Sequence, residues 1–332
     1  MKVTIKTVAA KAGVSISTVS RVLNNTVYVD DEKRSRVKQA IQDLGYKPNQ
    51  AARRLINKQT NSIGLILPGI YGEYFSELIK GMDNVASMNN YDFLISNLNR
   101  NNPLIEKNFN AMYGRVDGVI IMYPSIAQKE AEDLLSYKIP TLFFNSLGAD
   151  YNANIINVNN FDGAFKIVKH LIEHGYKKIA IIKGDERSYD AKQRLEGYRL
   201  AISEIDGVNY KLEVNGNFSI ESGYKAVKEI FNNHDLPKAI FASNDAMAVG
   251  AIKALKEVNL RIPEDVAVVG FDDIPMVQYL SPRLTTIRTD LQKTGERLIK
   301  KILEIIKMGN LNDIEKTFLS YELVVRESCG IH

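Results

Sequence analysis

Cysteine is almost absent from the sequence, and long apolar segments are absent altogether. The single cysteine, Cys329, cannot form an intramolecular disulfide, which fits a reducing compartment. No apolar run approaches the length of a membrane span. Lys6 and Lys11 interrupt the N-terminal stretch where a signal peptide would need an apolar core. We therefore expect a cytoplasmic protein with no membrane partner.

The sequence patterns of common enzyme active sites are also missing. The sequence contains no Walker A loop, no G-x-G-x-x-G and no nucleophile elbow. His170, Glu173 and His174 do form the H-x-x-E-H pattern of inverted zinc metallopeptidases. A helix whose buried stripe is centred on Val168 and Ile172 would place both histidines on the opposite, solvent face, and no third ligand is evident. We expect no catalytic residue, no metal and no cofactor, and hence no enzyme.

Positive charge is concentrated at the N-terminus. The 332 residues carry a net charge of +4. Residues 1–60 contain 12 Lys and Arg but four acidic residues, so this segment carries +8 and the remainder −4. With 45% hydrophobic and 25% charged residues, the composition is otherwise that of a globular protein. A basic segment on a mildly acidic body predicts binding to a polyanion.

The basic segment begins with the pattern of two short helices. Thr4 is a good N-cap for a helix that ends before Gly13. Ser15 can cap a second helix over residues 16–23. Small and β-branched residues stand where two helices would cross over a tight turn: Ala9, Gly13 and Val19.

A third helix completes the pattern. Asp30 can cap it, Gly45 ends it, and its apolar residues have helical spacing: Val37, Ala40, Ile41 and Leu44. Ser17 and Arg21 then point away from the core of the three helices. This arrangement predicts a helix-turn-helix headpiece that offers its second helix to the major groove of double-stranded DNA.

Residues 48–56 have the pattern of a helix of about two turns, which is marginal in water when isolated. Asn49 can cap it, and Ala52 favours helix in its interior. The alternative is a plain linker. Two arginines and an apolar pair beside a basic headpiece instead favour a minor-groove element, with Leu55 as a wedge between base steps. Such a helix would become ordered only on DNA, beside its twin from a second subunit.

The stretches TIKTVAAKAGVSISTVSRVLNN and VYVDDEKRSRVKQAIQDLGYKPNQAARRL resemble the headpiece and hinge of the LacI/GalR repressor family. The resemblance implies that Ile16, Ser17 and Arg21 face base edges and that Leu55 intercalates. It places four further residues near phosphates: Thr4, Ser15, Ser20 and Asn24. Thr7 departs from the family, which usually has aspartate there.

Beyond residue 61, apolar strands alternate with amphipathic helices. The strands are expected at 62–67, 92–97, 118–123, 141–144, 178–183, 238–243 and 265–270. This alternation predicts an α/β fold of parallel sheets covered by helices. One long sheet is possible, but two lobes fit the size better.

The family resemblance implies a two-lobed domain similar to periplasmic sugar-binding proteins, in which the chain passes between lobes near 160, 289 and 320. We therefore expect a headpiece at 1–47, a hinge at 48–60 and an effector-binding domain at 61–332. Its N-lobe would comprise about 61–160 and 290–320, and its C-lobe about 161–289 and 321–332.

Ligands of open α/β sheets contact the loops at the carboxyl ends of the strands. Six residues follow predicted strands in this way and Phe218 precedes a predicted helix, which gives seven candidates: Tyr74, Phe75, Asn145, Arg194, Phe218, Asn244 and Asp272. The polar side chains can hold vicinal hydroxyls through paired hydrogen bonds, and the phenylalanines offer flat faces to a ring. That mixture suits a sugar. These residues could instead have structural roles. Asn244 could be an N-cap, Asp272 a turn residue, and the two phenylalanines part of the core.

The segments RLEGYR, NFSIESGY, ASNDAMAVGA and VVGFDDI resemble family segments that line an effector cleft. The loop at 72–75 departs from the commoner Asn-Pro-Phe-Phe and leaves the ligand open. We predict a homodimeric repressor of a palindromic operator, controlled by a small molecule, with a sugar favoured. A partner protein or a non-sugar metabolite remains the alternative signal. A solute-binding protein is disfavoured by the headpiece and by the missing signal peptide.

Overall fold

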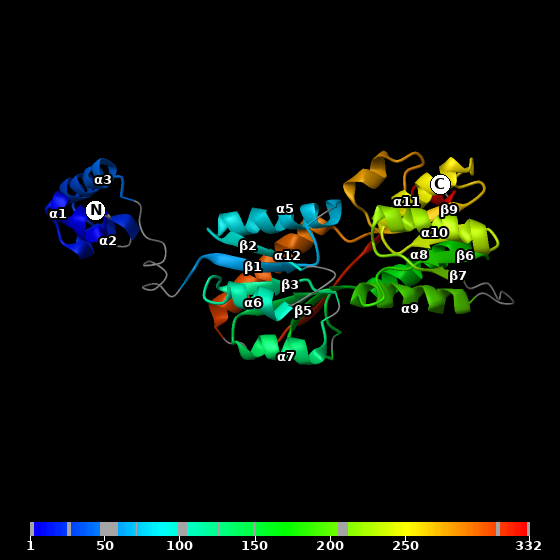
Figure 1. Cartoon of the computed structure of the whole chain (residues 1–332), viewed down its shortest axis with the longest axis horizontal. Coiled ribbons are helices and arrows are strands. Elements are labelled where there is room, and N and C mark those ends of the chain that lie inside the picture. The colour runs from blue at the N-terminus through cyan, green and yellow to red at the C-terminus, as the bar shows by residue number, and fades with distance from the viewer. Residues whose placement is uncertain are drawn as a thin grey trace. The chain divides into compact units, whose positions relative to one another are not determined.

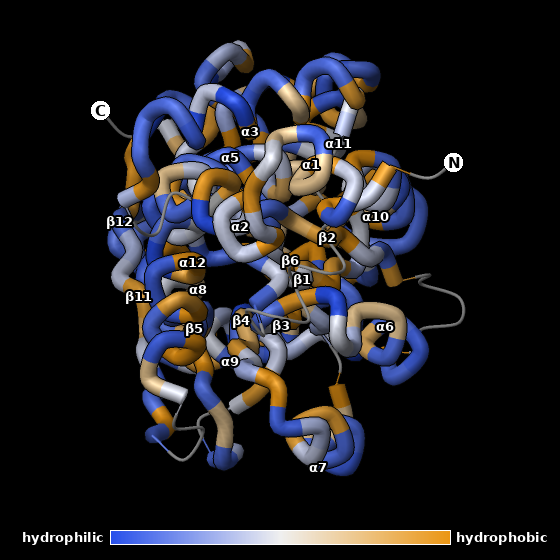
Figure 2. The backbone as a smooth tube through the Cα atoms, turned by 90° about the vertical axis from the view of Figure 1, so that its left-hand side faces the viewer, coloured by the Kyte–Doolittle hydropathy of each residue, from blue (hydrophilic) through white to orange (hydrophobic). Residues whose placement is uncertain are grey.

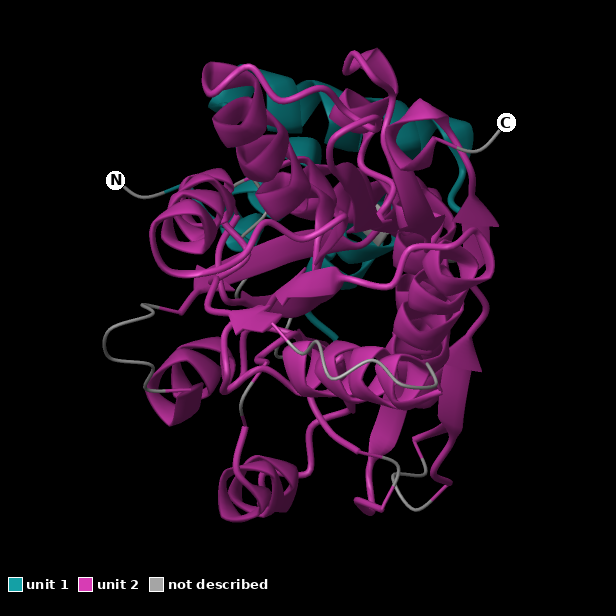
Figure 3. Ribbon diagram, turned by 90° about the vertical axis from the view of Figure 1, so that its right-hand side faces the viewer, with its two compact units in different colours: residues 1–60 teal, residues 61–332 magenta. Residues whose placement is uncertain are grey.

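The computed structural model describes residues 3–24, 28–46, 59–70, 72–98, 105–124, 126–148, 150–204, 212–309 and 313–330. The chain divides into two compact units, residues 1–60 and 61–332 (Figure 3). The predicted hinge helix, with Asn49, Ala52 and Leu55, lies outside the described residues.

The first unit is built from three helices at the predicted places: α1 (Ile5–Ala12), α2 (Ile16–Asn24) and α3 (Asp31–Leu44). Asp30 caps α3 by accepting a hydrogen bond from the backbone N–H of Lys33 (3.2 Å). Gly13 and Gly45 end α1 and α3 in the left-handed region, at φ 63° and 58°, which glycine adopts without steric cost. Small and β-branched residues fill the core: Val8, Ala9, Ala12, Val19, Val37 and Ala40.

Thr7 preserves the cap of α1 although it replaces the usual aspartate of the family. The backbone N–H of Thr7 donates to Oγ1 of Thr4 (3.4 Å), and the backbone N–H of Thr4 donates to Oγ1 of Thr7 (3.3 Å). This reciprocal pair satisfies two backbone donors that the start of a helix leaves without partners. The start of α1 therefore remains capped, although Thr7 departs from the family pattern.

The second unit contains two six-stranded sheets, of order β11-β5-β4-β3-β1-β2 and β12-β10-β9-β8-β6-β7. All neighbouring strands are parallel except β10 and β12. The first sheet consists of β1 (Ser62–Leu67), β2 (Asp92–Asn97), β3 (Gly118–Ile121), β4 (Thr141–Phe144), β5 (Asn154–Val158) and β11 (Lys316–Leu319). The second consists of β6 (Ile179–Ile182), β7 (Leu212–Val214), β8 (Ala239–Ala242), β9 (Ala267–Asp272), β10 (Thr285–Arg288) and β12 (Glu322–Val324).

Helices cover both faces of each sheet, which makes two α/β lobes (Figure 1). In the N-lobe, Ile63 and Leu65 of β1 pack with α5 and α12, while Ile66 packs with α6 and α7. Figure 2 shows the hydrophobic residues of β1 in the interior of this arrangement. The N-lobe helices are α5 (Glu73–Met88), α6 (Ile105–Met112), α7 (Gln128–Ser136) and α12 (Leu291–Met308). The C-lobe helices are α8 (Asn160–Glu173), α9 (Tyr189–Ser203), α10 (Ile220–Asn233) and α11 (Asp245–Glu257).

The chain passes between the lobes three times. It crosses from β5 to α8, from β10 to α12, and from β11 to β12. The third crossing gives each lobe an edge strand from the C-terminal part of the chain. None of the described helices combines the length and the apolar composition needed to cross a membrane.

The strands that the sequence analysis missed are the shorter or more polar ones. Buried strands such as β1 are buried throughout and mostly apolar because helices cover both faces of the sheet, whereas β12 has three residues and none of them is buried. The predicted strand at 265–270 is displaced, since β9 spans Ala267–Asp272. Asp265 instead binds Arg261 in the preceding turn, and Asp272 still pairs in register with Arg288 of β10.

Candidate functional site

The second helix of the headpiece exposes the residues predicted to read bases. Ile16 is 44% exposed, Ser17 and Arg21 are also exposed, and Val19 on the opposite side is fully buried. Ser15 directly precedes this helix, and its Oγ accepts a hydrogen bond from the backbone N–H of Thr18 (3.1 Å).

Among the residues predicted to lie near phosphates, Thr4 and Ser15 are exposed and Ser20 is partly exposed. The side chain of Asn24 lies outside the described part of the chain. The face of α2 therefore presents an arginine, a hydroxyl and an apolar group together, which is a combination suited to base edges and thymine methyls.

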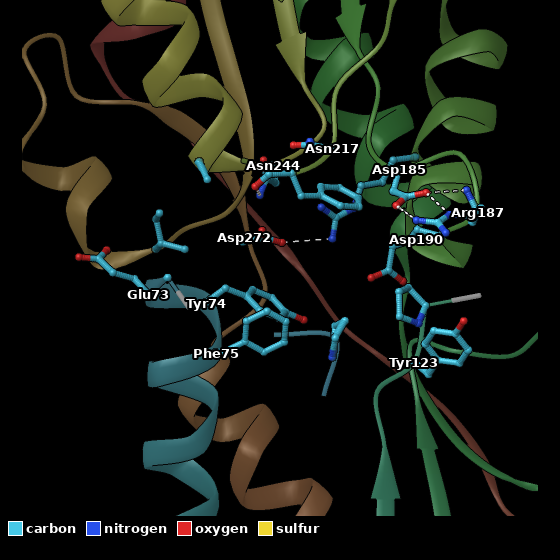
Figure 4. A pocket seen from close by; sticks show the side chains of 18 of the residues that line it. Glu73, Tyr74, Phe75, Tyr123, Asp185, Arg187, Asp190, Asn217, Asn244 and Asp272 are labelled. Atoms are coloured by element: carbon cyan, nitrogen blue, oxygen red, sulfur yellow. Dashed lines mark hydrogen bonds and ion pairs between the residues drawn. The ribbon is translucent and has the colours of Figure 1, made fainter. Parts of the chain in front are cut away.

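A cavity of about 220 Å³ lies between the two lobes (Figure 4). A single water needs roughly 10–15 Å³ on this measure, so the cavity has the size of a small metabolite. Six of the seven predicted effector residues line it: Tyr74, Phe75, Arg194, Phe218, Asn244 and Asp272. Tyr74 and Phe75 come from the N-lobe at the start of α5, and the other four come from the C-lobe.

Arg194 is the most strongly fixed side chain of the cavity. It is 3% exposed, and its guanidinium lies 3.7 Å from the ring centre of Phe271. Nε donates to Oδ1 of Asn160 (2.8 Å), Nη1 donates to the carbonyl of Ser243 (2.5 Å), and Nη2 donates to Oδ1 of Asp272 (3.1 Å). A guanidinium has five N–H donors, so two remain for a ligand in an orientation set by the protein.

Asp272 lies at the carboxyl end of β9, with φ 111° and its side chain almost fully buried. Burial raises the pKa of its carboxyl group to about 6, although the charge and hydrogen bond of Arg194 oppose that rise. Asp272 therefore does more than form a turn. Its backbone is strained, its side chain is buried, and its carboxylate faces both Arg194 and the cavity.

Asn244 serves both as an N-cap and as a residue of the cavity. Its Oδ1 caps α11 by accepting from the backbone N–H of Met247 (3.0 Å), and its Nδ2 donates to the carbonyl of Phe218 (3.2 Å). Phe218 has φ 66°, and its ring lies so close to Gly184 that a Cβ there would be 2.1 Å from Cζ. Asn244 therefore positions the aromatic wall that Phe218 contributes to the cavity.

Asn145 is placed differently from the other six. It is buried, and its Oδ1 accepts a hydrogen bond from the backbone N–H of Val158 (2.7 Å). Burial raises the pKa of both Tyr74 and Asp190, and the nearby Nδ2 of Asn145 opposes that rise, although it forms no hydrogen bond of good geometry within the described residues. Asn145 therefore stands behind the lining residues as a spare donor.

The sequence analysis missed Asp190, which lines the cavity one helical turn before Arg194. Asn160 Nδ2 donates to its Oδ1 (3.0 Å). Burial raises the pKa of Asp190 to about 7, against the lowering effect of Arg194 and with a further rise from Asp272. Its spacing from Arg194 was the available signal, since residues i and i+4 share a helix face. Other lining residues that were not predicted include Glu73, Tyr123, Asp185, Arg187 and Asn217.

The predicted orientation of His170 is wrong. His170 is 8% exposed, because the buried face of α8 is centred on Ile167, Val168 and Leu171 and reaches under the C-terminal residues. Its Nε2 lies 3.7 Å from Sγ of Cys329, and burial lowers its pKa. His174 is exposed, as predicted. Across the described residues, no three His, Cys, Asp or Glu side chains are grouped to hold a metal ion.

A helix-turn-helix unit followed by a two-lobed α/β unit with a polar and aromatic cavity defines a bacterial transcription regulator. Comparison with known families agrees. Residues 4–49 match the family "Bacterial regulatory proteins, lacI family", and residues 168–329 match a "Periplasmic binding protein-like domain".

Relatives and solved structures extend this match over almost the whole chain. The HTH-type transcriptional repressor PurR of Haemophilus influenzae (strain PittEE) is 35% identical over 98% of each chain. The ribose operon repressor of Escherichia coli (strain K12) is 33% identical, covering 93% of this chain and 94% of that one. The Lac repressor dimer bound to operator and the anti-inducer ONPF superposes with a TM-score of 0.89 at 29% identity, over 99% of each chain.

A LacI family regulator from Enterococcus faecalis V583 with bound ribose matches 80% of this chain and 98% of its own, at 27% identity and a TM-score of 0.73. The chain therefore belongs to the LacI family of transcriptional repressors.

Proposed function

We propose that this protein binds a palindromic operator as a homodimer in the cytoplasm and that an uncharged sugar, held between its lobes, controls the affinity for that operator. The observation that carries the proposal is the arrangement of Arg194, Asp190 and Asp272 around one cavity with aromatic walls. The relatives named as a ribose operon repressor and as a regulator with bound ribose support it.

The cavity favours a ligand with hydroxyl groups and no negative charge. Asp190 and Asp272 offer carboxylate acceptors, while the remaining N–H groups of Arg194 offer donors, so a pair of vicinal hydroxyls can both donate and accept. Tyr74 and Phe75 meet edge to face, with ring centres 5.1 Å apart, and present apolar surface to a sugar ring. A phosphate or carboxylate on the ligand would lose its hydration beside the buried carboxyl groups, and the two arginines among the described lining residues, Arg187 and Arg194, are already paired with Asp185 and Asp272.

A panel of candidate effectors tests the sugar proposal. We expect an uncharged sugar such as D-ribose, at about 100 times its Kd, to raise Tm by roughly 5–10 °C, since binding of that strength stabilises by about 2.7 kcal/mol. Thermal-shift measurements with D-ribose, D-galactose, cellobiose, adenine and ribose 5-phosphate provide the comparison. Ribose 5-phosphate should give no shift.

A response to adenine alone would replace the sugar by a heteroaromatic metabolite, for which the aromatic walls also have the right faces. If no small molecule shifts Tm, the cavity is not an effector site and a partner protein becomes the signal. The LacI family membership and the headpiece hold in either case.

The DNA half of the proposal rests on the basic headpiece and on the exposed face of α2. Each subunit would place α2 in a major groove, and the two half-sites would lie about 34 Å apart. The segment at 48–60 is proposed to act as the hinge, with Asn49 and Ala52 in its helix and Leu55 in the minor groove.

Replacing Arg21 by alanine should cost about 1–3 kcal/mol of operator binding and relax specificity at one base pair, because an arginine can bind both acceptors of a guanine. In vitro selection from randomised duplexes supplies the operator, and fluorescence anisotropy at fixed salt measures Kd for each base substitution. Lys11→Ala is the matched control, since it removes one positive charge that is paired with Asp43 (3.0 Å). Equal weakening on every duplex would show that Arg21 contacts phosphate instead.

A further inference from the structure

The loop that departs from the family pattern joins the two lobes directly. Glu73 is the first residue of α5 in the N-lobe, and its Oε2 accepts a hydrogen bond from the backbone N–H of Met276 (2.7 Å). Met276 belongs to the 3₁₀ helix η1 (Pro275–Tyr279) of the C-lobe, a few residues after Asp272. Glu73 also lines the cavity, and Figure 4 shows it beside Tyr74.

A second bond joins the lobes at another part of the same cavity. The backbone N–H of Tyr189 donates to the carbonyl of Pro124 (2.7 Å). Figure 4 places Glu73 and Tyr123, the neighbour of Pro124, on opposite sides of the cavity. The bond at Pro124 uses backbone groups only, and so any sequence could form it. The bond at Glu73 depends on one side chain.

The chemistry of Glu73 suits a contact of this kind. A carboxylate that accepts from a backbone N–H makes a charge-assisted hydrogen bond, which is stronger than a bond between neutral groups. The position at the start of α5 also favours a negative charge, because the N-terminal end of a helix carries a partial positive charge. A proline at this position, which the commoner family pattern has, offers no acceptor that reaches the other lobe.

The bond from Glu73 therefore favours the closed arrangement of the two lobes even when no ligand is bound. A ligand that binds the closed arrangement has an apparent affinity proportional to the population of that arrangement. The next two residues, Tyr74 and Phe75, form the N-lobe wall of the cavity, so the same bond also fixes where that wall stands.

We propose that Glu73 is a positioning residue that holds the two lobes together across the cavity and thereby raises the affinity for the effector. The proposal rests on the effector role of the cavity. The bond from Glu73 distinguishes this chain from relatives with the commoner loop, in which closure of the two lobes would depend more completely on the ligand.

The distance between the lobes is the direct measurement. Lys129 on α7 and Lys225 on α10 are exposed, and Cys329 is fully buried, so cysteines introduced at both lysines can be spin-labelled selectively. Labelled protein is mixed with excess unlabelled protein, so that each dimer carries at most one labelled chain. Pulsed electron resonance then gives the distribution of distances between the lobes, without any ligand and with D-ribose.

Glu73→Ala should lengthen and broaden this distribution in the absence of sugar. It should weaken D-ribose binding roughly tenfold, and saturating D-ribose should restore the short distance. Glu73→Gln, which keeps a neutral acceptor, should lie between Glu73→Ala and the wild type. Glu77→Ala is the matched control, because Glu77 lies one turn further along α5 and contacts Gln292 inside the N-lobe (2.5 Å); its distances should equal those of the wild type.

A Glu73→Ala distribution identical to that of the wild type without sugar would overturn the proposal. So would an equal lengthening in Glu77→Ala, since the effect would then belong to α5 as a whole. If D-ribose binds none of the variants, the choice of sugar is wrong, and the distances without ligand alone decide the role of Glu73.

Discussion

Replacing Arg194 by alanine is expected to abolish the effector response and to destabilise the second unit by roughly 3–5 kcal/mol, because the change leaves the carboxylate of Asp272 buried and unpaired. The carbonyl of Ser243 and the side chain of Asn160 lose their donors in the same step. For a unit of this size the loss corresponds to a fall in Tm of about 10 °C. Thermal melts and titrations with D-ribose measure the two effects separately.

A loss of stability alone would not establish a binding role, so two further variants are needed. Asp272→Asn keeps the shape of the side chain and should weaken D-ribose binding by about 100-fold with a much smaller fall in Tm, since no group is left without a partner. Arg283→Ala breaks an exposed pair with Glu327 at the surface and should change Tm by little. If the Asp272→Asn protein binds the sugar with normal affinity, the pair of Arg194 and Asp272 has a structural role only.

Replacing Asp190 by asparagine is expected to stabilise the protein at pH 8 and to weaken sugar binding by about 10- to 100-fold, the value of a hydrogen bond to a charged group. The amide oxygen of the new side chain would still accept the bond that Asn160 donates to Asp190, so the packing of the cavity should survive. A gain in stability together with a loss of binding is typical of a residue retained for function.

The pH dependence follows from the raised pKa of Asp190, about 7 against an ordinary value of 3.8. A group whose pKa is raised in the folded protein favours the fold when protonated. Its stabilising contribution is complete below about pH 4 and is lost as the pH rises through about 7. At pH 8 the ionised carboxyl group costs on the order of 4 kcal/mol, so Asp190→Asn should raise Tm by about 8–16 °C there and by little near pH 4.

Sugar binding should depend on pH in the opposite sense. If hydroxyls donate to the carboxylate of Asp190, the affinity for D-ribose should fall about tenfold between pH 8 and pH 6, as the ionised fraction falls. Asp272, with a pKa of about 6, and the permanent charge of Arg194 face the same group, and Asp272 adds to the fall only near pH 6 and below.

Calorimetric titrations at pH 6, 7 and 8 measure this slope. Asp190→Asn should flatten it, whereas Asp185→Asn should retain it, because Arg187 already holds the carboxylate of Asp185 through two bonds (3.0 and 2.8 Å). A wild-type affinity that does not change over this range would show that Asp190 does not bind the sugar as an anion.

Most of the fold could be predicted because its signals are local. The headpiece helices begin at side chains that satisfy backbone donors, such as Thr4 and Asp30, and end at Gly13 and Gly45. Strand β1 reads as an apolar run because both of its faces are covered. By contrast β12 is three residues long and carries neither signal, since its pairing depends on a chain crossing that no local pattern specifies.

The sequence by itself determined which residues reach the carboxyl ends of the parallel strands, and six of its seven candidates line the cavity. Only the tertiary structure decided what those residues do there. Asn145 turned inward to hold Val158, Asp190 entered the cavity beside Arg194, and His170 became buried against Cys329. Strand and helix periodicity act over a few residues, whereas burial, ion pairing and the pKa of a carboxyl group depend on neighbours that are distant in the sequence. The bond between Glu73 and Met276 joins residues that are 203 positions apart, and so only the folded chain could reveal it.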